Sequence, residues 1–394
     1  MKVPLLDLKP QLAELRDEIL EKITSVIDST RYIQGPEVAA LEEEISHYCG
    51  VSEGVGVSSG TDALLVALMA LDLDPGDLIL TTPYSFFATM GIILRVGAKP
   101  VFADIDPVTF NMDPEQAEII LENDRERKIK AIIPVHLYGQ CADMEKIISI
   151  AQRYNIPIIE DAAQAIGAEV PITANGSQRW QRAGSLGLAG CFSFFPSKNL
   201  GAIGDGGMVI SQNSSFADKM KLMRNHGAYP KYYHAIVGGN FRLDPIQAVV
   251  LRLKLRHLEK WHQARRRNAE RYEMLFAEAD IAQNSTIQLP QAVYKKRADS
   301  DHSRNYHIYN QYIIRAKRRD ELRAWLGSKN VSTEIYYPLC LHQQECVKGV
   351  VEVPTLSHAE KAATETLALP IYPELTLDMQ EYVVKSIADF YKQE

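Results

Sequence analysis

One lysine, one aspartate and one glutamine follow apolar segments of this 394-residue chain. Lys198 lies in a turn between an apolar stretch and the glycine-rich segment 201–207. Asp161 and Gln164 come shortly after the apolar run 156–159. Pyridoxal phosphate (PLP) requires an amine for a Schiff base, an acid for its pyridinium nitrogen and a donor for its phenolic oxygen. The pattern therefore predicts a PLP site in which Lys198 and Asp161 are catalytic.

Each of these residues also has a simpler interpretation. A lysine in a loop is far more often exposed than catalytic. Asp161 could serve only as the N-cap of a helix starting at residues 162–165, and its residue type alone gives both interpretations about equal weight. Context favours the site, because Lys198 follows an apolar segment and precedes glycines that let the backbone approach a ligand closely. An anionic Asp161 would keep a ring nitrogen protonated, which makes the ring a better electron sink.

A phosphate site is predicted at residues 58–64, where Ser-Ser-Gly-Thr-Asp-Ala-Leu opens a strongly helical segment. Free N–H groups at the N-terminus of a helix bind phosphate, although an ordinary capped helix explains the same residues. The hydroxyl group of Ser193 could contribute to the same phosphate site. Phe86 could stack on a flat ring, although a lone aromatic side chain is more often part of the core.

Composition excludes several classes of function. The chain is 46% hydrophobic and 24% charged, which is typical of a globular protein with a large core. A net charge of -7 disfavours a nucleic-acid partner. Five scattered cysteines without a CxxC pair predict reduced thiols and a cytoplasmic protein. No run of apolar residues is long enough to span a membrane, the start does not resemble a signal peptide, and no metal site is predicted.

Strand-like and helical segments alternate along the first two thirds of the chain. Amphipathic helices are predicted near residues 12–26 and 37–48. Strand-like runs then alternate with helical segments, at residues 78–80, 100–102, 131–135, 156–159 and 208–210. This alternation predicts an α/β fold with a mostly parallel sheet covered by helices on both faces.

The pattern changes near residue 244. One long helix is predicted up to about residue 278, and a mixed region with a strand at 309–314 and helices near 319–326 and 380–391 follows. We therefore predict a large domain over residues 1–245 and a smaller C-terminal α/β domain over residues 246–394. The polar stretch 171–182 is predicted to be a surface loop.

A series of ordered motifs resembles the DegT/DnrJ/EryC1/StrS family of PLP-dependent nucleotide-sugar aminotransferases. The similar segments run nearly from end to end of the chain: residues 60–64, 134–140, 160–164, 193–207, 224–227, 240–244, 247–248, 337–339, 342 and 369–373. So many matches in the same order make a chance resemblance very unlikely.

The resemblance implies fold type I of the PLP enzymes and a homodimer with shared active sites. It assigns Lys198 as the Schiff-base lysine, Asp161 as the partner of the ring nitrogen, Gln164 as a neighbour of the phenolic oxygen and Phe86 as the stacking residue. It also assigns the phosphate surroundings and the sugar-nucleotide contacts. The phosphate neighbours are Gly60, Thr61, Asp62, Ser193 and, from the other subunit, Asn240; the sugar-nucleotide contacts are Arg242, Tyr337 and His342.

The activity that the resemblance implies is transfer of an amino group to a nucleotide-linked keto sugar, with glutamate as the amino donor. Some relatives carry histidine in place of the lysine and dehydrate sugars, whereas this chain keeps Lys198. The sequence Gly-Gly-Asn-Phe-Arg at 238–242 favours a 3-keto over a 4-keto substrate. Two alternatives stay open: a PLP-dependent sugar dehydratase, and a non-catalytic sensor or regulator that kept the fold.

Overall fold

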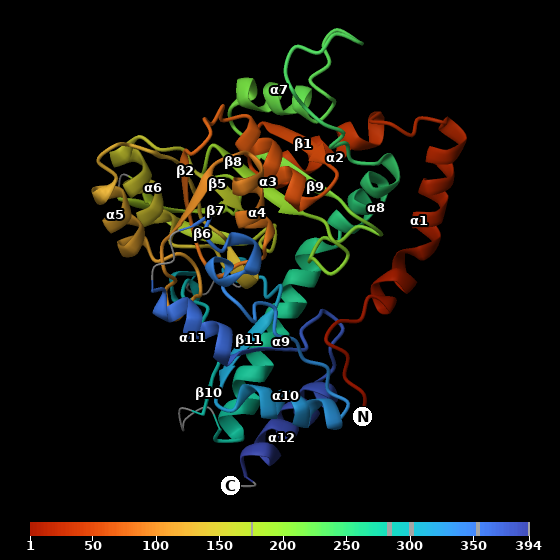
Figure 1. The fold of residues 1–394 in the computed structure, drawn as a ribbon. Coiled ribbons are helices and arrows are strands. Elements are labelled where there is room, and N and C mark those ends of the chain that lie inside the picture. The colour runs from red at the N-terminus through yellow and green to blue at the C-terminus, as the bar shows by residue number, and fades with distance from the viewer. Residues whose placement is uncertain (175, 282–285, 299–302, 352–354, 393–394) are drawn as a thin grey trace.

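The computed structural model describes residues 1–174, 176–281, 286–298, 303–351 and 355–392 (Figure 1). A large part that contains the main sheet lies at the top of Figure 1, and a smaller part lies below it. Helix α9 (Leu258–Glu278) runs from the first into the second. Both ends of the chain lie in the lower part.

Seven strands form the large sheet in the order β3-β2-β4-β5-β8-β9-β1. Parallel bridges from Ile132 to Ile158 and from Val135 to Asp161 join β4 to β5. Of the seven, β9 alone runs against the others, so the predicted mostly parallel sheet is confirmed. The strands are β1 (Glu53–Val57), β2 (Leu78–Thr81), β3 (Lys99–Phe102), β4 (Ile129–Ile133), β5 (Ile159–Asp161), β8 (Ala189–Ser193) and β9 (Gly207–Ser211).

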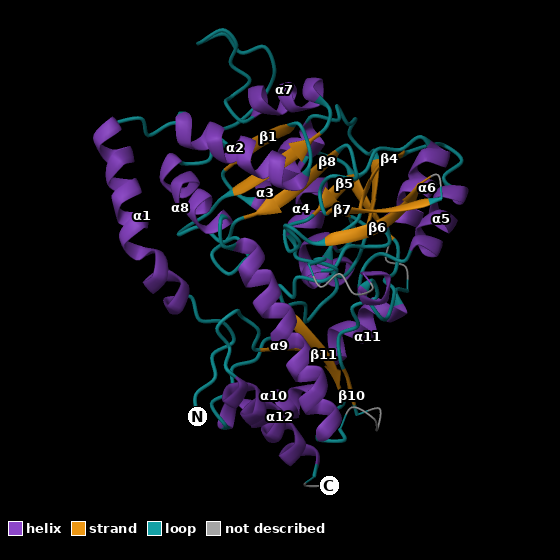
Figure 2. Ribbon diagram, turned by 180° about the vertical axis from the view of Figure 1, so that it is seen from behind, coloured by secondary structure: helices purple, strands orange, loops and turns teal. Residues whose placement is uncertain are grey.

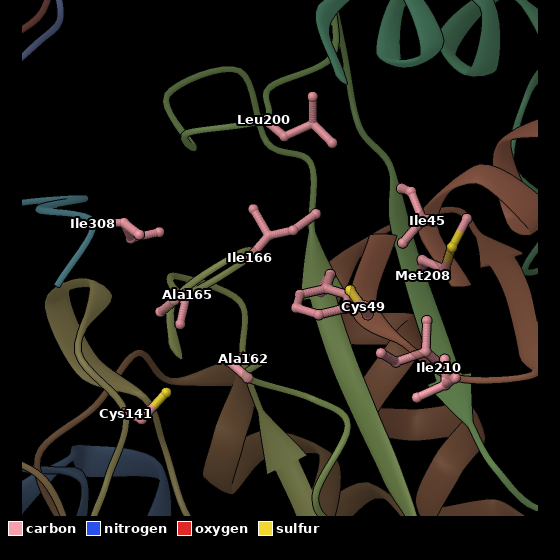
Figure 3. Packing of buried hydrophobic residues seen from close by; sticks show 14 of the residues in the cluster. Ile45, Cys49, Cys141, Ala162, Ala165, Ile166, Leu200, Met208, Ile210 and Ile308 are labelled. Carbon is pink, nitrogen blue, oxygen red and sulfur yellow. The ribbon is translucent and has the colours of Figure 1, made fainter. Parts of the chain in front are cut away.

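Helices cover both faces of this sheet. Successive side chains of a strand point to opposite faces, and both sets are buried here. Phe192 and Met208 face α1, α2, α6 and α8, whereas Cys191 and Val209 face α3, α4 and α7. Figure 3 shows the first of these cores, in which side chains of α2 and β9 meet. The helices of the large part are α1 (Lys9–Ser29), α2 (Pro36–Cys49), α3 (Gly60–Met69), α4 (Ala88–Arg95), α5 (Pro114–Asn123), α6 (Met144–Tyr154), α7 (Ser214–Met223) and α8 (Pro245–Leu255).

The smaller part has its own antiparallel sheet, β10-β11-β12, and its own core. Tyr272 and Phe276 of α9 pack there with Leu322 and Val384. The N-terminus also belongs to this part, because Val3 pairs with Val331. Its elements are β10 (Ile287–Gln288), β11 (Tyr312–Ala316), α10 (Arg319–Ser328), α11 (Ser357–Glu365), β12 (Thr366–Leu369) and α12 (Leu377–Tyr391).

Short 3-10 helices complete the described elements: η1 (Leu137–Gly139), η2 (Lys295–Ala298), η3 (Leu341–Gln343) and η4 (Glu345–Val347). No helix in the described ranges is both long and apolar enough to cross a bilayer.

The prediction of a surface loop at residues 171–182 is wrong. The segment forms an antiparallel hairpin of β6 (Glu169–Ala174) and β7 (Ser177–Arg182). Val170 is buried and Trp180 half-buried, so the hairpin covers part of the large core despite its many polar residues. The backbone N–H of Thr173 donates to Glu145 on α6, which fastens the hairpin to that helix. Residue 175 lies outside the described residues.

Two predicted boundaries also differ from the structure. The long helix predicted at 244–278 is two helices, α8 and α9, which meet at Arg256 and His257. No proline or glycine marks this break; the two helices separate because α8 packs on α1 and α2 while α9 continues into the smaller part (Figure 2). The strand predicted at 156–159 is displaced to Ile159–Asp161, and before it Ile158 forms only a single parallel bridge to Ile132.

The division into two domains stays a prediction. The packing favours a boundary within α9 rather than near residue 245, because α8 contributes Val250 and Leu253 to the core of the large part.

Candidate active site

Lys198 lies on a tight turn that follows β8. Its backbone N–H donates to the Phe195 carbonyl over 2.8 Å, and the N–H of Ala202 returns to the Phe194 carbonyl, also over 2.8 Å. Gly201 fits this turn because a Cβ there would lie only 2.3 Å from the Pro196 carbonyl oxygen. The turn therefore holds Lys198 in one place between β8 and the glycine-rich segment, as its sequence predicts.

The surroundings of the turn fix it further. The side-chain amide of Asn199 donates to the Ile308 carbonyl over 3.1 Å, and Lys254 of α8 donates to the Gly201 carbonyl. Leu200, beside the lysine, is fully buried in the core that Figure 3 shows. The loop that carries the lysine is thus anchored on both sides of that residue.

Burial lowers the pKa of Lys198 to about 8, although the negative charge of Asp161 acts in the opposite direction. No described residue forms an ion pair or a side-chain hydrogen bond with the ammonium group. A lysine amine becomes a nucleophile when it loses its proton, so the lowered pKa makes Lys198 suited to covalent chemistry near neutral pH.

Asp161 ends β5 with a buried carboxylate. Its Oδ2 accepts from the hydroxyl of Thr89 over 2.8 Å and its Oδ1 accepts from the N–H of Ala163 over 3.2 Å. Burial raises the pKa of Asp161, and these two donors and the charge of Lys198 offset part of the rise. Residues 162–165 form turns rather than a helix, so the alternative in which Asp161 only caps a helix is wrong.

A second buried pair stands on the strand beside Asp161. The carboxylate of Glu160 lies 2.8 Å from Nε2 of His136 and accepts from the N–H groups of Gly184, Leu186 and Gly187. The other ring nitrogen, Nδ1 of His136, accepts from a backbone N–H, so the Nε2 proton is the one donated to Glu160. This pair ties β4 to β5 immediately before Asp161.

The predicted phosphate site lies at the N-terminus of α3. Ser59 is the N-cap and accepts from the N–H of Asp62, whose carboxylate accepts from the hydroxyls of Ser58 and Ser59. The carboxylate of Asp62 is therefore engaged within the cap. A Cβ on Gly60 would lie 2.5 Å from the Cβ of Ser193, so glycine is needed here for Ser193 to pack closely against the first turn of α3. Thr61 follows in the first turn of the helix.

Phe86 comes two residues before the start of α4. Its ring is 63% exposed, which is unusual for phenylalanine and leaves a face free for a ligand or another chain. Its carbonyl accepts from the N–H of Thr89, the residue whose hydroxyl donates to Asp161. Phe86 and Asp161 are thus connected through a single residue.

The side chains of Gln164 and Tyr337 are hydrogen-bonded to each other although the two residues lie far apart in the sequence. The amide nitrogen of Gln164 donates to the Tyr337 hydroxyl over 2.7 Å, and its oxygen accepts from the N–H of Tyr138 over 2.7 Å. Both polar groups of the Gln164 side chain are therefore already engaged. Tyr337 is buried against the rings of Tyr84 and Tyr138, and burial raises its pKa well above the usual range.

Asn240 and Arg242 lie beside the N-terminus of α3. They follow residues 228–239, a projecting segment that we call the arm (Figure 1). Arg242 pairs with Val57 through a backbone bridge, and its guanidinium donates to the side chain of Asn225 over 2.8 Å. Asn240 is exposed. The structure therefore places both residues near the predicted phosphate site but away from the Gln164–Tyr337 contact.

His342 has a different environment from the other predicted site residues. Its side chain is completely enclosed, with Nε2 3.1 Å from a carboxylate oxygen of Glu360. Its ring centroid lies 6.1 Å from that of Phe102. The structure thus brings together Lys198, Asp161 and the α3 N-terminus, whereas His342 stands behind the site rather than on its surface.

These groups fit PLP. The N-terminus of α3, with Ser193 packed beside it, suits a phosphate. The buried carboxylate of Asp161 suits a cationic ring nitrogen, and the amine of Lys198 suits a covalent link to the aldehyde carbon. Among the described residues, no group of three or more histidine, cysteine, aspartate and glutamate side chains is arranged to hold a metal ion.

The chain belongs to the DegT/DnrJ/EryC1/StrS aminotransferase family, whose family model matches residues 13–388. It is 47% identical over 395 residues to a pleiotropic regulatory protein of Geobacillus stearothermophilus, covering 100% of this chain and 99% of that protein. It is 40% identical over 375 residues to a UDP-N-acetyl-3-dehydro-alpha-D-glucosamine 3-aminotransferase of Acidithiobacillus ferrooxidans, covering 95% and 94%. It is 37% identical over 373 residues to a UDP-2-acetamido-2-deoxy-3-oxo-D-glucuronate aminotransferase of Pseudomonas aeruginosa, covering 95% and 96%.

Solved structures agree with this assignment. A DegT DnrJ EryC1 StrS aminotransferase from Brucella abortus is 34% identical and superposes with a TM-score of 0.88 over 98% of this chain and 99% of that one. A Bacillus subtilis protein solved with bound cofactor PMP is 31% identical, with a TM-score of 0.85 over 100% of this chain and 86% of that one. The predicted family, fold and PLP-type cofactor are therefore confirmed.

Some residues of the site carry no signal in the sequence. Thr89 is a threonine within a helix, and only the fold shows that its hydroxyl meets Asp161. Tyr138 supports Gln164 through its backbone N–H, with φ of 60° that its residue type does not predict. Glu160 is adjacent to Asp161 in the sequence, and its four hydrogen-bond partners are brought together only by the fold.

The close approach of Gly60 and Ser193 leads to the first prediction. Replacing Gly60 with alanine forces a Cβ into contact with Ser193 and moves the α3 N-terminus, at a cost of about 1–3 kcal/mol. We expect Gly60→Ala to raise the dissociation constant for PLP at least about tenfold, measured by titrating the apo-protein. The control is Gly327→Ala, because a Cβ there meets nothing within 4 Å. Equal PLP affinity in both variants would contradict the predicted phosphate site.

The lowered pKa of Lys198 leads to the second prediction. Because its folded-state pKa of about 8 lies below the ordinary lysine pKa of 10.5, the buried ammonium costs stability below pH 8, and the cost fades as the pH rises to about 10.5. We expect apo Lys198→Met to melt at a higher temperature than the apo wild type at pH 7, with a smaller difference at pH 10. Lys348→Met, at a side chain that is 71% exposed, is the control. A difference that does not change with pH would show that Lys198 is not held in this environment.

Proposed function

We propose that this protein is a PLP-dependent aminotransferase that converts a nucleotide-linked keto sugar into an amino sugar, with glutamate as the amino donor. The observation that carries the proposal is the buried Asp161 carboxylate beside an amine, Lys198, whose pKa burial lowers to about 8. The names of the Acidithiobacillus and Pseudomonas relatives support the substrate class.

The chemistry divides between the cofactor and the chain. PLP, when bound, supplies an electron sink for the electrons left when a proton is removed from carbon. Lys198 is the general base that removes this proton from the donor's α-carbon and the acid that returns it on the cofactor side. Asp161 keeps the ring nitrogen protonated, and the N–H groups of α3 with Ser193 hold the phosphate. Phe86 limits the ring to one plane by stacking on it.

We propose amination at C3 of the sugar. The Acidithiobacillus relative is named for a 3-dehydro sugar and the Pseudomonas relative for a 3-oxo sugar. The sequence Gly-Gly-Asn-Phe-Arg at 238–242 supports the same position. Asn240 and Arg242 would then complete the site of the neighbouring subunit.

We also propose a homodimer in which each site receives residues of both chains. Large apolar side chains are exposed beside the Lys198 turn, among them Phe86, Phe195 and Ile203. The arm that precedes Asn240 exposes a further set at its tip: Tyr229, Tyr232, Tyr233 and Val237. Apolar surface of this extent around a site favours coverage by another protein surface. The five cysteines are all free, which supports action in the reducing cytoplasm.

A regulatory role is the second candidate, because the Geobacillus relative is named a pleiotropic regulatory protein. A protein that only senses a ligand has no need of an amine with a lowered pKa next to a buried carboxylate. Retention of both Lys198 and Asp161 therefore favours catalysis, and retention of lysine disfavours the dehydratase alternative.

The third prediction tests the activity. PLP-loaded protein incubated with glutamate and a panel of UDP-, dTDP- and GDP-linked 3-keto and 4-keto sugars should yield one amino sugar, detected by mass as replacement of the carbonyl oxygen by NH₂ and one hydrogen. Lys198→Ala should remain folded but give no multi-turnover product, because no other described amine stands in that position. A glutamate-dependent change of the visible spectrum without any product from the panel would favour a different acceptor. No spectral change at all would favour the regulatory candidate.

The fourth prediction tests the shared site. Lys198→Ala and Asn240→Ala chains are each expected to form nearly inactive homodimers. Mixed dimers should contain one site with both lesions and one with neither, so activity should rise severalfold above that of either parent. Mixing Lys198→Ala with itself under the same refolding conditions is the control. Mixed dimers that form without recovering activity would show that Asn240 acts in its own subunit.

A further inference from the structure

Residues 337–343, which we call the bridging segment, connect two walls of the candidate site. At one end the Tyr337 hydroxyl accepts from the side chain of Gln164, three residues after Asp161. Near the other end the N–H of Leu341 donates to the Pro83 carbonyl over 2.7 Å, three residues before Phe86. A movement of this segment would therefore disturb the neighbours of both Asp161 and Phe86.

His342 lies in the bridging segment but has no access to a bound molecule. Its side chain has an exposed fraction of 0%. Its Nε2 is 3.1 Å from Oε1 of Glu360, and the aromatic ring of Phe102 lies on its other side. In this conformation no substrate atom can contact His342.

Glu360 in turn belongs to a helix that is fixed to the large sheet. Asp104, which follows β3, is buried and accepts from the first free N–H groups of α11: Oδ2 from His358 over 2.9 Å and Oδ1 from Ala359 over 3.0 Å. This carboxylate caps α11 from another part of the chain, in the position where an acidic group is most stabilising. The helix therefore holds Glu360 at a defined distance from the sheet.

We infer that His342 and Glu360 form a positioning pair, which holds the bridging segment so that Tyr337 can orient the amide of Gln164. In this role His342 acts through Tyr337 and does not contact the sugar nucleotide. The inference rests on the proposed function for its kinetic consequences only. Its structural consequences concern the surroundings of the cofactor and do not depend on which sugar is the substrate.

The buried aromatic rings explain why a small displacement would matter. The Tyr337 ring lies 5.2 Å from that of Tyr84 in an edge-on arrangement and 6.0 Å from that of Tyr138 in a stacked one. Tyr138 also supplies the N–H that holds the Gln164 oxygen. Since packed rings adopt discrete arrangements, loss of the anchor behind Tyr337 would change the direction in which Gln164 presents its N–H.

The fifth prediction compares Glu360→Ala, His342→Asn, the double variant and Glu360→Gln. Glu360→Ala and His342→Asn should each slow both half-reactions, with glutamate and with the sugar, about three- to tenfold. Each should also weaken PLP binding to the apo-protein and shift the visible absorbance of the loaded protein. The double variant should be no worse than the worse single one, because both remove the same contact. Glu360→Gln should retain most of the wild-type behaviour, since its amide oxygen can still accept from Nε2.

Lys361→Ala is the matched control, because it changes the next residue of α11 at a side chain that is 64% exposed. Melting temperatures identify any variant that fails to fold, and Glu360→Asp, which withdraws the carboxylate by one carbon, then replaces Glu360→Ala. The inference is overturned if His342→Asn slows the sugar half-reaction alone while Glu360→Ala behaves like Lys361→Ala. If no sugar reacts with the wild type, the proposed function fails, whereas PLP affinity and absorbance still decide between the two roles of His342.

Discussion

The site depends on keeping a carboxylate charged in a place where water is excluded. Burial alone raises the pKa of Asp161, so its negative charge is maintained only by the groups around it. Thr89 and the N–H of Ala163 donate to its two oxygens, and the charge of Lys198 acts in the same direction. The same burial lowers the pKa of Lys198 to about 8. Burial therefore strengthens the attraction of the charged Asp161 carboxylate for a cation, and it makes the Lys198 amine easier to deprotonate.

Much of the polar structure around Asp161 exists to hold the ends of two strands in place. Glu160 points to the opposite face and is satisfied by three backbone N–H groups and by His136. A buried carboxylate left without such donors would cost several kcal/mol, so this set of contacts fixes the local backbone as well as the charge. The position of Asp161 therefore depends on the contacts of Glu160, whose side chain points to the opposite face of the sheet.

The sequence is most informative where one residue type has one physical use. The centre of the site is predicted by Lys198, in a turn before glycines, and by Asp161, after an apolar run. The residues around this centre are predicted only by the family resemblance. The sequence is least informative where long-range packing decides. The hairpin at 169–182 has polar residues on its outer face and resembles a loop, because its apolar residues are few and widely spaced. His342 lies in the expected motif, yet its burial against Glu360 depends on α11, which no local pattern predicts.

Helix α9 has a mechanical consequence. Its first turns carry Leu258 and Trp261 into the core of the large part, and its last turns carry Tyr272 and Phe276 into the core of the small part. Between them, the guanidinium of Arg265 donates to the carbonyls of Tyr309 and Ile371, one on each flanking segment. A continuous helix of this kind resists bending, since a kink would break its hydrogen bonds. The two parts are therefore joined by one continuous helix that packs in both cores. We expect reactants to enter by movement of loops and side chains rather than by rotation of one part against the other.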